Sequence, residues 1–309
     1  MASRSTAAVV VQGSLRARSR DSSGAILQVL LVLALLFSLA TLLVLVFDQV
    51  AKAMPVFQER GIDFLTSGLS ANPANAGVAQ GILGTAIIAV LVSLFAFPLG
   101  IATAVYLEEY APDNRFTRIL VLNIRNLAGV PSVVFGLLGL SVFVAALSAM
   151  GVGNGRNLIS AGLTLTVLIL PIVIITTSEA LRAVPSTIRE AGFGIGASRW
   201  QVVRKLLLPA ASPGILTGTV LALSRALGET APLIVAGAVM GFYSNVGAST
   251  ADTLTGPYTA LPVIVYDWSR RPQEEFRALT AAAIVVLLVI TVITNAVAIV
   301  LRNRAERTW

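Results

Sequence analysis

Long apolar stretches separated by short polar segments dominate the pattern of this sequence. An α-helix needs about 20 consecutive apolar residues to cross the hydrocarbon core of a bilayer. Six stretches reach that length, and five of them contain no Asp, Glu, Lys or Arg. The pattern therefore predicts an all-α, polytopic membrane protein with six transmembrane helices. The predicted spans are residues 25–47, 78–107, 127–149, 158–178, 214–241 and 278–301.

The segments outside these spans suggest how the chain is organised. Residues 1–24 are rich in Ser, Ala and Arg, which predicts a flexible tail, and residues 25–309 then form one six-helix transmembrane domain. The stretch 25–47 exceeds the apolar region of a signal peptide, about 7–15 residues, so we expect an uncleaved membrane anchor. The next segment, residues 48–77, contains two prolines and two asparagines and is predicted to be an irregular loop.

Composition and charge agree with a membrane protein and predict its orientation. The 309 residues are 56% hydrophobic and only 12% charged, and their mean hydropathy is +0.86. With six spans, 15 of the 22 Lys and Arg residues lie on the side that holds both termini, and 6 lie on the other side. Basic residues favour the cytoplasmic side, so both termini are expected to be cytoplasmic. This topology explains the net charge of +7 without a nucleic-acid partner.

Several classes of chemistry have no support in the sequence. Cysteine and histidine are absent, which removes the commonest thiolate and imidazole ligands and the usual proton carrier at neutral pH. Nucleotide-binding and hydrolase motifs such as GxxxxGK[ST], HExxH and GxSxG are also absent. We therefore expect no catalytic residues, no metal site and no cofactor in this chain. An active transporter built from it needs an ATPase from elsewhere.

The fifth predicted span is unusual because it contains two charges, Arg225 and Glu229. Charges at membrane depth are costly and mark substrate pathways more often than they serve as structural pairs. Pro232 lacks an N–H, so the carbonyl of Gly228 loses its helical partner and a helix bend is predicted there. On a continuous helix, residues 225, 229 and 232 share one face. Small residues at 214, 218, 222 and 226 form a neighbouring ridge that permits close helix packing.

The loop at residues 181–212 is predicted to contain two short helices. Thr187 and Glu190 fit a capping box, and Ser198 and Gln201 fit a second one. Glycines at 194 and 196 can end the first helix, because glycine readily adopts the left-handed conformation. Capping alone leaves two readings open, an amphipathic hairpin on the membrane surface or a rigid knob that docks into a partner.

Motif spacing favours the docking knob. The run Glu190-Ala191-Gly192, with Gly196 and then Leu208-Pro209, resembles the EAA loop of ABC-importer permeases, with Gly192 in place of the usual second alanine. The run from Arg225 through Gly228-Glu229-Thr230-Ala231-Pro232 to Leu233 resembles phosphate-importer permeases of the PstA type. Residues 129–136 and 261–276 fit the same family, and the resemblance covers residues 81–301.

The resemblance implies a MetI-like fold of a type I ABC importer in the bacterial inner membrane. It implies a heterodimer with a sister permease, two cytoplasmic ATPase subunits that bind ATP and Mg²⁺, and a periplasmic phosphate-binding protein. Glu190, Ala191 and Gly196 are then expected to couple the chain to the ATPase. We expect Arg225 to hydrogen-bond phosphate oxygens, and Glu229 to hold Arg225 and accept the proton of hydrogen phosphate. Alternatives are a permease for another oxyanion, a sister-type subunit, or an ATP-independent transporter or channel.

The last polar segment, residues 242–277, carries three tyrosines and a tryptophan among charged residues. We expect most of these aromatics to be anchors at the membrane interface. A second reading assigns the charged residues of this segment to contacts with the binding protein. The aromatics in question are Tyr243, Tyr258, Tyr266 and Trp268, and the charged residues assigned to these contacts are Asp252, Arg270, Arg271 and Glu274.

Overall fold

The computed structural model describes residues 22–241 and 250–306, and every regular element in these ranges is helical. The chain divides into two compact units, Met1–Ala51 and Lys52–Trp309. The predicted flexible tail, residues 1–24, lies almost entirely outside the described residues, as does Tyr243.

Six helices in the described ranges are long and apolar enough to cross a membrane, which confirms the predicted number of spans. Their ends differ from the predicted ends by a few residues or, in the first and fifth spans, by a dozen or more. The six are Gly24–Arg60, Ala79–Tyr110, Ser132–Ala149, Leu158–Arg182, Arg199–Gly228 and Glu275–Val300.

The first span belongs to α2 (Ser22–Arg60), a single helix of 39 residues. The prediction of an irregular loop from residue 48 is wrong, because the helix continues for another three turns. Ala53 and Val56 of these turns are buried together with Phe64 of α3 (Asp63–Thr66). A helix with an apolar face to bury is stabilised by that packing, so it does not end where the continuous apolar run ends.

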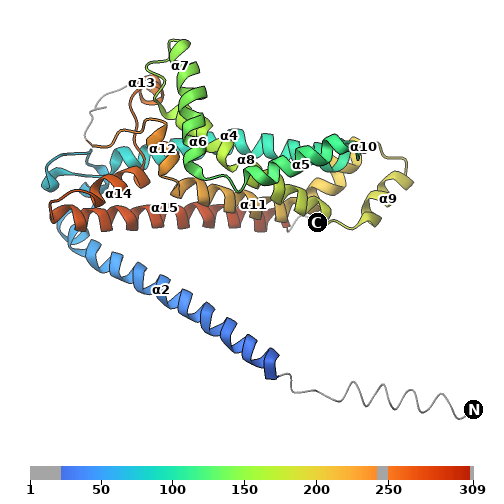
Figure 1. Ribbon diagram of the computed structural model, residues 1–309, viewed down its shortest axis with the longest axis horizontal. Coiled ribbons are helices and arrows are strands. Elements are labelled where there is room, and N and C mark those ends of the chain that lie inside the picture. The colour runs from blue at the N-terminus through green and yellow to red at the C-terminus, as the bar shows by residue number, and fades with distance from the viewer. Residues whose placement is uncertain (1–21, 242–249, 307–309) are drawn as a thin grey trace, which may run out of the picture. The chain divides into compact units, whose positions relative to one another are not determined.

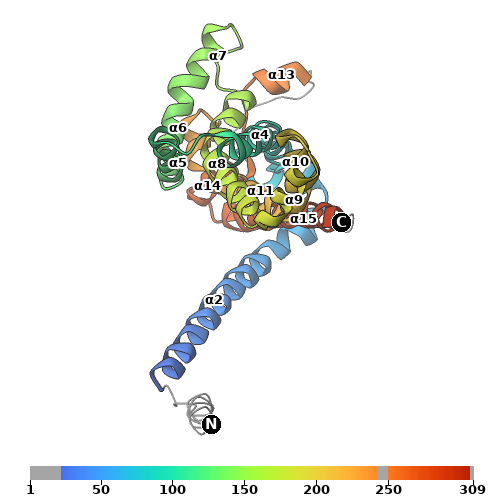
Figure 2. The same cartoon turned by 90° about the vertical axis from the view of Figure 1, so that its right-hand side faces the viewer.

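Four long helices build the core of the Lys52–Trp309 unit. They are α4 (Ala79–Val105), α8 (Leu158–Arg182), α11 (Leu208–Gly228) and α15 (Glu275–Glu306). α8 packs against both α4 and α11, and α11 also packs against α15. Figure 2 shows α11 between α8 and α15. α8 is the most buried of the six spans, which makes it the centre of the bundle.

Small residues bring α8 and α11 close together, as the predicted ridge requires. A Cβ added at Gly214 would lie 2.8 Å from Ala180 Cβ, and one added at Gly218 would overlap Thr176 Oγ1. Ala222 and Ala226 continue this side of α11 and are buried in the main hydrophobic cluster. The ridge is therefore a helix-packing surface, as predicted.

The third span begins at residue 132 and not at 127. α5 (Arg115–Leu127) is a separate amphipathic helix, and the span itself consists of α6 (Ser132–Leu138), the π-helical η3 (Gly139–Val144) and α7 (Ala145–Ala149). Pro131 occupies the N-cap position of α6, with φ −56° and ψ 137°, so the helix begins at Ser132. In Figure 1 this span crosses the other helices of its unit steeply.

The segment after residue 249 is more ordered and more buried than predicted. It forms α13 (Thr250–Thr255) and α14 (Leu261–Ser269). Tyr258 and Trp268 are each 1% exposed, so the prediction that they anchor the membrane interface is wrong. Trp268 packs between Phe64 and Phe276, with ring centroids 6.4 and 5.7 Å away. Both side chains belong to the protein core.

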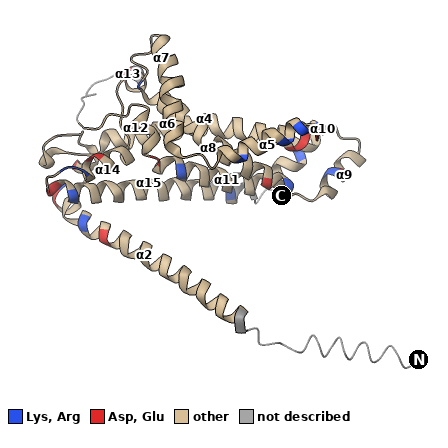
Figure 3. Ribbon diagram, in the orientation of Figure 1, with Lys and Arg blue, Asp and Glu red and all other residues tan. Residues whose placement is uncertain are grey.

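Most charged side chains gather at two places in the structure. Figure 3 shows them near α5 and α10 (Arg199–Val202) and again near α14. The long helices between these places are almost free of charge, as expected for spans.

Candidate pathway site and coupling hairpin

The fifth span is interrupted at the predicted bend. α11 ends at Gly228, Glu229 has an extended backbone (φ −76°, ψ 119°), and α12 (Ala231–Val235) begins two residues later with Pro232 in its first turn. The predicted bend in a continuous helix is therefore a complete break. Residues 225, 229 and 232 consequently do not share one helical face, and that prediction is wrong. Proline is well accommodated in a first turn, where its missing N–H has no partner to lose.

Arg225 and Glu229 nevertheless form an ion pair. Arg225 Nε donates to Glu229 Oε1 at 3.3 Å. The Glu229 N–H donates to the carbonyl of Ala226 at 3.2 Å, which turns the chain back over the last turn of α11. A guanidinium in the last turn is also favoured by the helix dipole. The Glu229 side chain is 16% exposed and the Arg225 side chain 47%, so the arginine has open space around it.

The break is held by a segment that follows α13. Thr230 Oγ1 donates to the carbonyl of Pro262 at 3.5 Å, and the Tyr258 hydroxyl donates to the carbonyl of Leu233 at 3.2 Å. The Val239 N–H donates to the Tyr258 carbonyl at 2.8 Å. Burial raises the pKa of the Tyr258 phenol, so this hydroxyl keeps its proton and remains a donor. Sequence reasoning missed this role, because it treated Tyr258 as a surface aromatic.

Two motifs that are distant in the sequence meet at the break. A Cβ added at Gly136 of α6 would lie 2.8 Å from Pro232 Cα and 3.0 Å from Val235 Cβ of α12. The absence of a side chain at Gly136 thus leaves room for α12, which contains Pro232. The sequence singled out both motifs, but nothing in their separate patterns predicts the contact.

The predicted hairpin of two short helices is present. α9 (Ser186–Gly194) is followed by α10 (Arg199–Val202) and the π-helical η4 (Val203–Leu207), and we call these three elements the α9–α10 hairpin. The Ser198–Gln201 capping box is confirmed, with reciprocal hydrogen bonds of 3.3 and 2.8 Å. The Thr187 capping box is wrong: the N-cap of α9 is Pro185, two residues earlier, and no side chain caps the helix.

The corner of the hairpin is a Schellman turn. Gly196 has φ +79°, its N–H donates to the Phe193 carbonyl at 2.9 Å, and the Ala197 N–H donates to the Gly192 carbonyl at 3.1 Å. This is the predicted role of Gly196, whereas Gly194 is the last helical residue. Close packing also limits position 192, where a Cβ would lie 2.9 Å from Val202 Cγ2 and 2.9 Å from Leu206 Cδ1.

The exposed side of the hairpin carries the predicted coupling residues. Glu190 and Ala191 are exposed, and so are the large apolar side chains of Phe193 and Ile195. A rigid corner with apolar side chains open to its surroundings can enter a groove on a partner protein. The structure places Glu190, Ala191 and Gly196 together on this corner and apart from the Arg225–Glu229 pair, which lies at the other end of α11.

Sequence reasoning missed two carboxylates, one of which contacts α8 and the other the hairpin. Glu108 and Glu109 lie in the π-helical η2 (Tyr106–Tyr110) at the end of α4. Glu108 accepts from Arg182 Nε at 2.8 Å, and Glu109 accepts from Arg189 at 2.9 Å. The signal available in the sequence is a pair of acidic residues between two tyrosines directly after an apolar span.

Residues 96–307 match the family described as the inner membrane component of binding-protein-dependent transport systems. The chain therefore belongs to this family of permeases.

Several curated permeases are similar to the chain over most of their length. Phosphate transport system permease protein PstA 1 of Mycobacterium tuberculosis (strain CDC 1551 / Oshkosh) is 33% identical over 225 residues, covering 72% of this chain and 70% of that protein. PstA of Xylella fastidiosa (strain Temecula1) is 33% identical, covering 75% and 77%. PstA of Yersinia pestis is 30% identical over 285 residues, covering 90% of each chain.

Solved structures support the fold. A bacterial alginate ABC transporter chain matches with a TM-score of 0.62 at 18% identity, covering 91% of this chain and 96% of that one. A chain of the MetNI methionine ABC transporter matches with a TM-score of 0.57 at 18% identity, covering 74% and 95%. The fold is thus that of MetI-like ABC-importer permeases, as the sequence predicted.

Proposed function

We propose that the chain is the permease subunit of an ATP-driven importer for inorganic phosphate. The observation that carries the proposal is the similarity to proteins named phosphate permeases over as much as 90% of the chain. In this proposal it forms the translocation pathway with a sister permease and receives phosphate from a periplasmic binding protein. Two ATPase subunits bind the ATP and Mg²⁺, and this chain contributes no nucleotide site of its own.

Arg225 is suited to contact the transported phosphate. Its contact with Glu229 uses the Nε–H alone, while a guanidinium carries five N–H donors. The remaining donors can bind two oxygens of one phosphate in the paired geometry that guanidinium groups favour. The broken helix places this group beside irregular backbone, an arrangement that membrane proteins tolerate where a cavity is lined.

Glu229 gives the site a means to distinguish hydrogen phosphate from a fully deprotonated oxyanion. Its carboxylate can accept the proton that hydrogen phosphate still carries, while it holds Arg225 in position. A sulfate ion offers no such proton at neutral pH and meets the same carboxylate as a repulsive charge. The proposal therefore includes a preference for phosphate within the membrane, in addition to selection by the binding protein.

The α9–α10 hairpin is the proposed contact with the ATPase subunits. Its exposed corner combines Glu190 and Ala191 with two large apolar side chains, and its caps make it rigid. With 15 of 22 basic residues on the side of the termini, the hairpin and both termini face the cytoplasm of a bacterium and the chain lies in its inner membrane.

Phosphate uptake by cells that depend on this importer tests the proposal. We expect Arg225→Ala and Glu229→Gln to reduce uptake about 100-fold, the scale on which loss of a positioned charged contact acts. Arg118→Ala is the matched control, because Arg118 forms an exposed ion pair with Asp113 outside the break. If Arg225→Ala and Glu229→Gln both assemble normally and take up phosphate at the wild-type rate, the two residues do not belong to the phosphate pathway.

Two further measurements distinguish a phosphate importer from a general oxyanion permease and from an ATP-independent channel. Sulfate uptake that equals phosphate uptake in the wild type would favour a general oxyanion permease. Phosphate flux through the purified chain alone in liposomes, without ATP or partners, would favour an ATP-independent channel.

A further inference from the structure

The π-helical η2 at the end of α4 contacts α8 and both helices of the hairpin, α9 and α10. Three consecutive residues of η2 each meet a different arginine: Glu108 pairs with Arg182, Glu109 pairs with Arg189, and Arg199 lies 5.5 Å from the centroid of the Tyr110 ring. These arginines stand at the end of α8, within α9 and at the start of α10. The single turn of η2 thus contacts α8, α9 and α10.

The π-helical geometry explains how three neighbours can reach three partners. Consecutive residues of a regular helix point about 100° apart, so only part of a turn faces one neighbouring element. In η2 the Ala111 N–H donates to the Tyr106 carbonyl at 2.8 Å, which closes a wider turn. Such insertions re-aim side chains and recur at functional positions.

Arg189 is the central contact of this turn. It donates to Glu109 at 2.9 Å and also to the carbonyls of Leu181 and Val184, at 2.9 and 3.0 Å. The Arg189 and Glu109 side chains are only 24% and 11% exposed. A partly buried, charge-assisted network of this kind is stronger than a surface ion pair. Arg189 therefore joins α9 to both α8 and α4.

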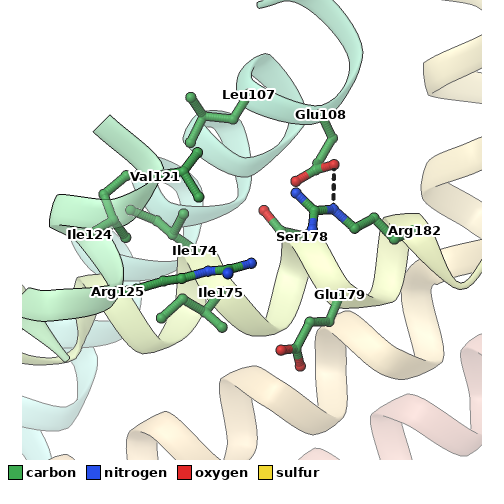
Figure 4. Close-up of a pocket in the computed structure, with 10 residues that line it drawn as sticks. All are labelled: Leu107, Glu108, Val121, Ile124, Arg125, Ile174, Ile175, Ser178, Glu179 and Arg182. Atoms are coloured by element: carbon green, nitrogen blue, oxygen red, sulfur yellow. Dashed lines mark hydrogen bonds and ion pairs between the residues drawn. The ribbon is translucent and has the colours of Figure 1, made fainter. Parts of the chain in front are cut away.

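The Glu108 contact borders a pocket between α4, α5 and α8. Figure 4 shows Glu108 hydrogen-bonded to Arg182, with Arg125, Ser178 and Glu179 among the side chains around the pocket. η2 thus packs against α8, and its Glu109 and Tyr110 side chains add the contacts with the hairpin.

The other end of α4 contacts the segment that supports the break. The Leu261 N–H donates to Thr85 Oγ1 at 2.9 Å, and a Cβ on Gly84 would overlap the carbonyl of Thr259. This segment bonds Thr230 through Pro262 and Leu233 through Tyr258. Thr85 and Glu109 are 24 residues apart, so about 35 Å of helix separates the two contacts.

We propose that η2 is a latch that fastens the α9–α10 hairpin to α4, and that α4 carries the hairpin's displacement to the α12 side of the break. α11 connects the second half of the hairpin covalently to the other side, at Gly228. The two sides of the break are thus connected to two parts of the hairpin by two separate helices. A rotation of the hairpin then changes the separation across Glu229 and Thr230. This inference rests on the proposed coupling function of the hairpin.

The first experiment measures phosphate imported per ATP hydrolysed by the complete complex in liposomes. We expect Glu109→Gln to lower this ratio about tenfold, a typical size for coupling between sites, while ATPase subunits still co-purify and hydrolyse ATP. The double reversal Glu109→Arg with Arg189→Glu should recover part of the ratio lost by either reversal alone. Asp113→Asn is the matched control, because its exposed ion pair with Arg118 does not touch the hairpin.

A second pair of variants tests the far end of α4. Thr85→Val removes the acceptor of the buried Leu261 N–H, whereas Thr103→Val removes an exposed hydroxyl that bonds only within α4. We expect Thr85→Val to lower the ratio and Thr103→Val to leave it unchanged. Combining Thr85→Val with Glu109→Gln should add little further loss, because both interrupt one connection.

Amide hydrogen exchange tests the latch without measuring transport, so the result does not depend on which substrate the complex imports. ATP binding to the complex should change amide exchange in residues 230–239, and Glu109→Gln should abolish that change. An unchanged transport ratio in Glu109→Gln, an unchanged exchange response, or a loss of transport that only follows loss of assembly would each overturn the latch. Absence of phosphate import by the wild-type complex would instead overturn the proposed function.

Discussion

Gly194 and Gly196 lie two residues apart at the end of α9 but have different backbone conformations. Gly194 is helical, whereas Gly196 has φ +79° and forms the corner of the hairpin. A Cβ at either position would have no atom within 4 Å. Substitution at these sites therefore tests backbone conformation without any effect of packing.

We expect Gly196→Ala to destabilise the corner by about 1–2 kcal/mol, because a Cβ is disfavoured in the left-handed conformation. Gly194→Ala should instead stabilise the helix by roughly 0.5–1 kcal/mol. The amide of Ala197, which donates to Gly192, reports the corner in hydrogen exchange. It should exchange roughly 5–30 times faster in Gly196→Ala. Equal exchange in the two variants would contradict the assignment of strain to Gly196.

The contact between α8 and α11 sets the position of the broken span. A Cβ at Gly218 would overlap Thr176 Oγ1, whereas a Cβ at Gly228 would meet no atom within 4 Å. We expect Gly218→Ala to lower the free energy of unfolding by about 1–3 kcal/mol, because the two helices must separate. Gly228→Ala is the control and should change it by much less. Denaturant unfolding in detergent micelles measures both, and equal effects would mean that the helices can separate freely.

Features that depend on local sequence were predicted well. The six spans follow from the length of each apolar run, and the Ser198–Gln201 box follows from four residues. α9 shows the limit of such reasoning. Its start after Pro185 differs from the predicted Thr187 cap, and its Arg189 is held by Glu109, 80 residues earlier in the chain. Contacts between distant segments leave no local pattern.

The break in the fifth span shows the same limit at the candidate site. Pro232 correctly located the disturbance, but a bend and a complete break have the same sequence pattern. The observed break depends on Thr230, Leu233 and their partners Pro262 and Tyr258, which lie about 30 residues further on. The Arg225–Glu229 pair was predicted from a helical spacing that the structure does not have, and it forms through the turn at Glu229 instead.

The distribution of charge predicts the orientation of the whole molecule. Reporter fusions test it: a green fluorescent protein fused after residue 303 should fluoresce, because the C-terminus is expected in the cytoplasm. Alkaline phosphatase inserted after Gly151 should be active, because residue 151 lies between the third and fourth spans on the opposite side. Gly151 suits the insertion, since it has φ +78° and no atom within 4 Å of a Cβ. The reverse result for both reporters would invert the topology.

The length of α2 has a consequence for the boundary between lipid and water. Its 39 residues rise about 58 Å, whereas a bilayer core is only about 30 Å thick. Residues 24–47 suffice to cross that core, so the turns that contain Ala53 and Val56 stand beyond it. These turns pack with Phe64 in a hydrophobic layer of their own. Because α2 is longer than the bilayer core is thick, it can cross bilayers of different thickness. A thicker bilayer covers more residues of the same continuous helix.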